Sequence, residues 1–216
     1  PMTPDGKFAS VRHGGKWYAG RQLMDYADAV VKSAWARGDE SALDMMWYLW
    51  CGNNSPFSGR VFHTFERAVV DDKSTWVEPM DPYFTLTKSP SVCDDIMREF
   101  GVAPMACSPT GHIINGHTPI HVKEGENPLK AHGRLIVIDG GFCKAYQKTT
   151  GIAGYTLIFN SHGMRLKSHQ PFFGMEAALK ENLDIDSDSQ QVVTFQKRVM
   201  VADTDTGEKL KEQIAD

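Results

Sequence analysis

The spacing of apolar residues changes near Gly111, and this change limits the chain to a fold with two kinds of regular structure. Before Gly111, apolar side chains recur every three or four residues, which is the spacing of one face of an α-helix. After it, short runs rich in β-branched and aromatic residues are separated by glycines and turn formers, as in strands. We therefore predict a mixed α/β (α+β) fold, with helices first and a mixed or antiparallel sheet after them.

Two helices are predicted near the start of the chain. Apolar residues at helical spacing run through residues 23–35, and Gly38 is placed to end this helix. Residues 41–50 form the second helix, with Asp39 or Ser41 as its amino-terminal cap. One apolar stripe of this helix, which we interpret as core, contains Leu43, Met46, Trp47 and Trp50.

A loop and a third helix complete the first part of the chain. Residues 51–59 are dense in glycine, asparagine, serine and proline, so they form a loop directly after a helix. Ser89 as cap, Pro90 at the first helical position and Gly101 as terminator delimit a helix over residues 90–100. Residues 1–107 are therefore predicted to be a mainly helical segment that carries this loop.

The second half is predicted to be a sheet. Six β-rich runs cover residues 112–114, 120–123, 135–138, 155–159, 164–169 and 191–201. Asn160 and Gly163 are suited to the positive φ angles of a hairpin turn between the fourth and fifth runs. Helices are expected at residues 175–183 and 208–214, with an acidic loop at 184–189. We divide this half into a β-rich segment, residues 108–174, and a C-terminal segment of helix, strand and tail, residues 175–216.

The composition excludes several classes of function. With 216 residues, 41% of them hydrophobic, the chain can bury a core. The 23 lysines and arginines against 27 acids give a formal charge of -4, so no overall basic field attracts nucleic acid or a membrane surface. No signal-peptide profile and no apolar run long enough to span a bilayer occurs. Four widely spaced cysteines are interpreted as reduced and buried, and we expect a soluble, cytoplasmic protein.

His117 is the strongest single candidate for chemistry. It follows an apolar run and lies between Gly116 and the Thr118-Pro119 pair, so its imidazole would emerge at a strand end on a constrained loop. A neutral imidazole is a ligand for manganese, iron or zinc. The local pattern leaves open the alternative of a structural histidine held by hydrogen bonds.

Asp139 and three cations are further candidates. Asp139 ends an apolar run and precedes two glycines, where its carboxylate could orient a metal-bound histidine or cap a turn. Lys144 and Lys148 lie among hydroxyls and glycines, a mixture suited to phosphate and equally to a solvated turn. Arg60 closes the loop at residues 51–59, where a guanidinium could bind phosphate in a bidentate manner or lie on the surface.

Several segments together resemble class 3 fructose-1,6-bisphosphatase. The longest are HIINGHTP (112–119), LIVIDGGF (135–142) and KAYQKTTGIAGYTLI (144–158). Shorter ones are MWYLW (46–50), NSP (54–56), TFER (64–67) and HQPF (169–172). Nearly the whole chain is similar to the C-terminal part of these enzymes.

The resemblance implies a relative of the calcineurin-like metallophosphatases, with a layered fold and a two-metal site at strand ends. It implies hydrolysis of the 1-phosphate of fructose 1,6-bisphosphate to fructose 6-phosphate in gluconeogenesis, with manganese as the usual metal. His117 matches a metal-ligating histidine of this group, Arg60 a phosphate-binding arginine, and Asp139 an aspartate near the site.

Other ligands of such a site are absent from the sequence. No Gly-Asp-x-x-Asp-Arg or Gly-Asn-His segment occurs, and Pro1 is not an initiator methionine. We expect the C-terminal part of a longer enzyme, inactive alone, whose partner is a sugar bisphosphate. Two alternatives stay open: an inactive interaction or regulatory domain, and a related phosphatase for another phosphoester. A homo-oligomer is also left open.

Overall fold

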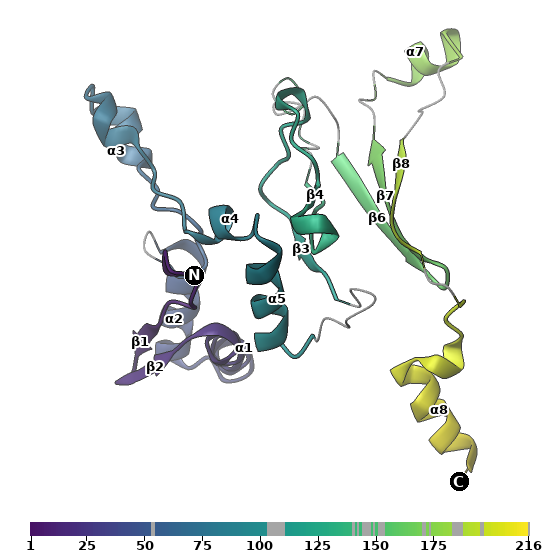
Figure 1. The fold of residues 1–216 in the computed structure, drawn as a ribbon. Coiled ribbons are helices and arrows are strands. Elements are labelled where there is room, and N and C mark those ends of the chain that lie inside the picture. Colours follow the sequence, from purple (N-terminus) through teal and green to yellow (C-terminus); the bar gives the residue numbers. More distant parts are fainter. Residues whose placement is uncertain are drawn as a thin grey trace. The chain divides into compact units, whose positions relative to one another are not determined.

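The chain divides into two compact units, Pro1–Gly111 and His112–Asp216. The computed structural model describes residues 1–52, 55–102, 111–139, 141, 143, 148, 150, 154–169, 172, 174–182, 188–194 and 197–215. Within these residues, seven α-helices and three small sheets confirm the mixed α and β fold (Figure 1). In the same part of the chain, no helix has both the length and the apolar character needed to cross a membrane.

The first unit is built on two packed helices, α1 (Gly20–Arg37) and α2 (Glu40–Cys51). α1 ends at Gly38, whose φ of 62° is left-handed, as glycine allows without strain. α2 begins after Asp39, whose carboxylate accepts hydrogen bonds from the N–H groups of Ser41 and Ala42 at 3.0 and 3.4 Å. Both predicted helix boundaries are thereby confirmed, and Asp39 rather than Ser41 is the cap.

Shorter elements complete the first unit. A hairpin of β1 (Val11–His13) and β2 (Lys16–Tyr18), absent from our predictions, turns at Gly14 and Gly15. α5 (Pro90–Glu99) confirms the third predicted helix; Ser89 occupies its cap position but contacts Ser91 instead of a backbone N–H. The remaining elements are α3 (Thr64–Val69), η1 (Lys73–Trp76) and α4 (Tyr83–Leu86).

The core of the first unit uses a different face of α2 from the one predicted. Its buried members are Val30, Ala34, Ala42, Met45 and Leu49. Trp47 and Trp50 are 63% and 78% exposed, so their interpretation as core residues is wrong. Because α2 carries apolar side chains on more than one face, their spacing alone could not identify the face that packs against α1.

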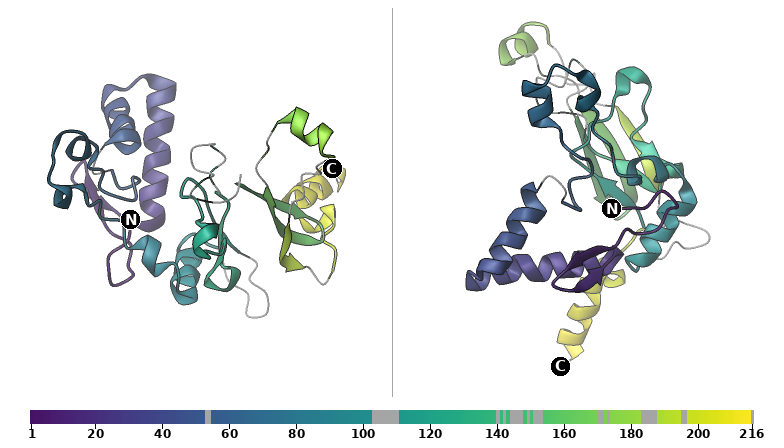
Figure 2. Two further views of the ribbon diagram at one scale, coloured as in Figure 1. Left: turned by 90° about the horizontal axis from the view of Figure 1, so that it is seen from above. Right: turned by 90° about the vertical axis from the view of Figure 1, so that its left-hand side faces the viewer.

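The second unit contains two three-stranded sheets. β3 (Ile113–Asn115), β5 (Leu135–Val137) and β4 (Leu129–Lys130) form the first, in that order; β3 is parallel and β4 antiparallel to β5. β6 (Gly154–Asn160), β7 (Gly163–His169) and β8 (Ser189–Thr194) form the second, which is fully antiparallel (Figure 2). Ile136 of β5 packs with Met164 and Leu166 of β7, so the two sheets share one core.

The predicted hairpin between β6 and β7 is confirmed, with Asn160 paired to Gly163. Among the described turn residues only Gly163 has a positive φ, 138°. A Cβ atom at this position would lie 2.0 Å from the carbonyl oxygen of Val193 in β8, so glycine is required by the close approach of the neighbouring strand.

Other predicted elements were shifted or wrong. Residues 120–123 are not a strand: Ile120 lies in a loop with 1% exposure, and η2 (Val122–Glu124) follows it. η3 (Ala131–Gly133) separates β4 from β5. β8 ends at Thr194, well before residue 201, where η4 (Val201–Asp203) begins. α7 (Met175–Lys180) and α8 (Asp205–Ala215) confirm two helices, and most of the acidic loop lies outside the described residues.

The cysteines are only partly as expected. Cys51, Cys93 and Cys143 are not in disulfide bonds, which agrees with the reduced state. Cys93 is buried, but Cys51 and Cys143 are exposed, so the prediction of burial is wrong for these two. Cys107 lies outside the described residues.

Candidate functional site

The loop that carries His117 lies at the same sheet edge as Asp139. β3 and β5 are parallel neighbours, so their carboxyl ends meet at one edge. The N–H of Ile138 donates to the carbonyl oxygen of Asn115, and the N–H of Ile120 donates to that of Asp139, each at 2.9 Å. The structure therefore brings together two segments that are separate in the sequence.

His117 has an uncommon backbone conformation. Its φ is 65°, in the left-handed region that residues other than glycine seldom adopt. Such conformations cluster at functional sites, where the surrounding structure maintains them. The residue is exposed, so its imidazole is open to a ligand.

Asp139 is half-buried and already has one partner. The N–H of Gly141 donates to its Oδ1 at 2.7 Å, as in a turn that an aspartate caps. This bond fixes the carboxylate at the end of β5, and a carboxylate has a second oxygen that can also accept a hydrogen bond. Its role in orienting a histidine stays a prediction.

Arg60 lies in the first unit, on an extended segment that we call the arm, residues 59–81. Arg60 pairs with Met80 in an antiparallel bridge, and the N–H of Asp81 donates to the carbonyl oxygen of Gly59 at 2.8 Å. The arm carries α3 and η1 at its end (Figure 1). Arg60 therefore lies where the two sides of the arm meet the rest of the unit.

Glu78 is the centre of a polar cluster in the arm. Its side chain is 9% exposed, and its Oε2 lies 3.7 Å from Nη1 of Arg60 and 3.3 Å from Nη2 of Arg67. The N–H of His63 donates to its Oε1 at 3.1 Å. This hydrogen bond, followed by the charges of Arg67 and Arg60, lowers the pKa of Glu78 against the opposing effect of burial.

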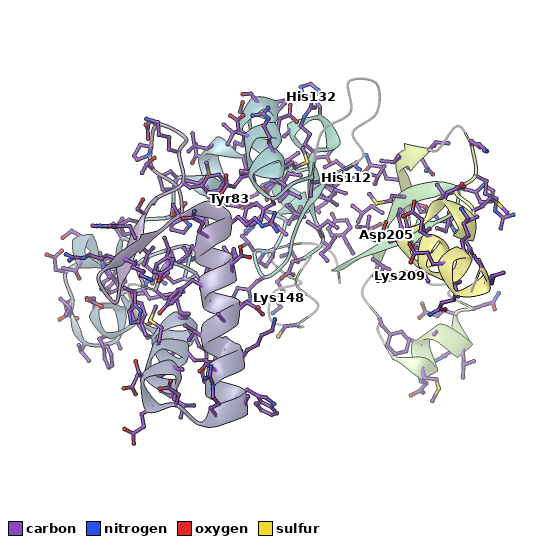
Figure 3. The ribbon with its side chains drawn as sticks, turned by 90° about the horizontal axis from the view of Figure 1, so that it is seen from below. Tyr83, His112, His132, Lys148, Asp205 and Lys209 are labelled. Carbon is purple, nitrogen blue, oxygen red and sulfur yellow. The ribbon has the colours of Figure 1, made fainter. Side chains whose placement is uncertain are left out.

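Of the two lysines predicted to bind phosphate, the structure describes only one. Lys148, labelled in Figure 3, is exposed. Lys144 lies outside the described residues. Their assignment to phosphate binding stays a prediction.

Two adjoining hollows, of about 230 and 380 Å³, lie in the first unit beside the hairpin β1–β2. His13, Ser41 and Met45 line both of them. The side chain of His13 contacts the Tyr26 hydroxyl through Nδ1. Arg60 lines neither hollow, so these concave surfaces do not coincide with the predicted phosphate-binding residue of this unit.

Residues 1–216, the whole chain, match the family model described as Firmicute fructose-1,6-bisphosphatase. The chain belongs to this family. Among relatives named class 3 fructose-1,6-bisphosphatase, the chain is 46% identical over 222 residues to that of Clostridium novyi (strain NT). It is 47% identical over 221 residues to one from Clostridium beijerinckii and over 222 residues to that of Fusobacterium nucleatum.

Each of these class 3 fructose-1,6-bisphosphatases is much longer than the chain. The matches cover 100% of the chain and 33%, 33% and 34% of the three relatives. The chain therefore spans about a third of the length of the relatives it matches. No solved structure matches it.

A metal site is not assembled by the described part of the chain. Within that part, no three His, Cys, Asp or Glu side chains are grouped so that they could hold a metal ion. Transition metals in proteins are held by several such side chains, and His117 offers one nitrogen. The described residues therefore do not fit a two-metal site by themselves.

Arg67 and Glu78 were missing from the site residues predicted from the sequence. The only signal was the TFER segment at residues 64–67, which contributed to the family resemblance without suggesting a role for its arginine. Glu78 is eleven residues beyond Arg67, and nothing local indicates that the two side chains meet.

Replacing Glu78 with glutamine is expected to lower stability at neutral pH, with an effect that shrinks in acid. Because the folded-state pKa of Glu78 lies below its ordinary value, the carboxylate stabilises the fold fully at any pH above that ordinary value. This contribution is lost as the pH falls through the lower folded-state pKa. Urea unfolding of both proteins at neutral pH and in steps below pH 4 measures the difference.

The control for this experiment is Asp71→Asn, which removes an exposed carboxylate from the same arm. Its effect on the free energy of unfolding should be small at every pH, because an exposed charge is screened by solvent. A Glu78→Gln effect that stays constant from neutral to acidic pH would contradict the ionised, paired state of Glu78.

Proposed function

We propose that this chain is the C-terminal part of a class 3 fructose-1,6-bisphosphatase. The full-length protein would hydrolyse the 1-phosphate of fructose 1,6-bisphosphate to give fructose 6-phosphate in gluconeogenesis. As an enzyme of sugar metabolism it would act in the cytoplasm. The observation that carries this proposal is the family match over all 216 residues, with 46–47% identity to relatives of that name.

The layered calcineurin-like fold is part of the same proposal. It is supported by two sheets that share a core around Ile136, Met164 and Leu166. It is also supported by the position of His117 and Asp139 at the carboxyl ends of parallel strands, where ligands of open α/β sheets bind.

Manganese is the metal of the proposal, with His117 as the one ligand contributed by the described residues. The remaining ligands would come from residues outside these. A bound metal would supply positive charge to the phosphoryl group and activate water. Asp139 would orient the imidazole by accepting a hydrogen bond from its second nitrogen.

The cations of this chain would act on the phosphates themselves. The guanidinium of Arg60 would donate to phosphoryl oxygens and offset the negative charge that gathers on them during hydrolysis. Lys144 and Lys148 would bind the phosphate that is not hydrolysed, as point charges.

Phosphate release by the full-length protein tests the function. With manganese present, fructose 1,6-bisphosphate should be hydrolysed far faster than a phosphopeptide or a dinucleotide of similar concentration. The 216-residue chain alone should release no phosphate above the blank, since its described residues do not assemble a metal site. Faster hydrolysis of another phosphoester would identify that compound as the substrate instead. Absence of turnover by the full-length protein would favour an interaction domain.

A further inference from the structure

Two arginines of the arm converge on one carboxylate oxygen. Arg60 lies before α3 and Arg67 within it, yet both guanidiniums contact Oε2 of Glu78. The side chain of Glu78 is less exposed than those of Arg60 and Arg67, which are 38% and 53% exposed. Nη2 of Arg67 also donates to the carbonyl oxygen of Trp76 at 3.4 Å. Both arginine side chains are partly open to solvent.

The backbone around this pair is fixed by further hydrogen bonds. Nδ1 of His63 donates to the carbonyl oxygen of Thr75 at 2.7 Å. The indole N–H of Trp76 donates to the carbonyl oxygen of Val70 at 2.9 Å. These bonds tie the two sides of the arm together across α3 and η1, so the backbone segments that carry the two arginines are held near each other.

The charge of the cluster favours an anion. Two guanidiniums against one ionised carboxylate leave one net positive charge, and the lowered pKa of Glu78 keeps the carboxylate ionised at neutral pH. Each guanidinium has five N–H donors in a planar fork, and the single carboxylate cannot accept from all of them. Forks of this kind match the oxygens of phosphate groups.

We propose that Arg60 and Arg67 together bind a phosphate monoester group, with Glu78 as the positioning residue for both guanidiniums. The inference rests on the proposed function, because it adds a second arginine to the one assigned to phosphate there. It differs from that assignment in making Arg67 an equal partner of Arg60. It also gives Glu78 a role in ligand binding besides its role in the stability of the arm.

Titration with inorganic phosphate tests this site without substrate or metal. The full-length protein is treated with a chelator and titrated calorimetrically at neutral pH and low salt. Arg60→Gln and Arg67→Gln should each raise the Kd for phosphate by about tenfold, as expected when a charged hydrogen-bond donor is lost. Glu78→Asp, which keeps the charge on a shorter side chain, should raise the Kd several-fold without changing the circular dichroism spectrum.

The matched control is Arg98→Gln, which removes an exposed arginine from another ion pair, with Asp95 on α5. Its Kd for phosphate should equal that of the wild type. If Arg67→Gln fails to fold, Arg67→Lys replaces it; this variant keeps the charge, loses the fork and should raise the Kd by a smaller factor.

Two results would contradict the proposed phosphate site of Arg60 and Arg67. One is the absence of saturable phosphate binding by the wild type. The other is a Kd for Arg67→Gln equal to that of Arg98→Gln, which would leave Arg67 with a structural role only. Neither depends on turnover, so a protein that hydrolyses fructose 1,6-bisphosphate yet shows either result would keep the proposed function and lose this inference.

Discussion

Replacing His117 with asparagine is expected to reduce kcat/KM of the full-length protein for fructose 1,6-bisphosphate by at least about 10- to 100-fold. Losses of that size follow when residues that merely support a metal ligand are changed, so loss of the ligand itself should cost no less. Asparagine is chosen because it tolerates the left-handed φ of 65° that His117 adopts. The substitution thereby removes the imidazole with little backbone strain.

The control for His117 is His132→Asn. His132 is also an exposed histidine of the second unit, labelled in Figure 3, and its φ of 55° is left-handed too. We expect wild-type activity for this variant. Phosphate release and bound manganese are measured for both proteins. If His117→Asn kept the activity and manganese content of the wild type, ligation by His117 would be excluded.

Replacing Ile136 with alanine is expected to destabilise the chain by about 4 kcal/mol, within the range for large apolar residues cut back in a core. Ile136 is 0% exposed, lies in the central strand of its sheet and packs against Met164 and Leu166 of the other sheet. The substitution would leave a cavity between the two sheets, which neither sheet can close without breaking strand pairing. Urea unfolding followed by circular dichroism measures the loss.

The matched control is Ile114→Ala. Ile114 is paired with Ile136 in the register of β3 and β5 but is 50% exposed. Its truncation removes the same atoms from a half-solvated position and should cost less than about 1.5 kcal/mol. Equal losses for the two variants would show that the shared core of the sheets does not depend on Ile136.

Local signals in the sequence predicted several elements correctly. Asp39 and Gly38 delimit the neighbouring helices, because a cap acts on backbone groups within a few residues of itself. The hairpin between Asn160 and Gly163 was also predictable, because a tight turn depends on the conformations that a few adjacent residues can adopt. The second glycine-based turn, at Gly14 and Gly15, was missed as a hairpin because its flanking strands have three residues each and no clear alternation.

The face of α2 that is buried was not predictable. Its apolar residues fall on two sides, and burial depends on where α1 packs, which no spacing within α2 encodes. Trp47 and Trp50 consequently appeared to be core residues and are exposed. An exposed aromatic pair of this kind, with ring centroids 5.6 Å apart, could be found only once the helices were packed.

The candidate site, too, was predicted from the sequence only in part. The sequence alone identified the family and selected His117, Arg60 and Asp139, because these depend on motifs of consecutive residues. Only the tertiary structure placed the loops of His117 and Asp139 at one sheet edge and brought Arg67 and Arg60 to Glu78. Such contacts join residues far apart in the chain, and they form only when strand pairing and packing bring the backbones together.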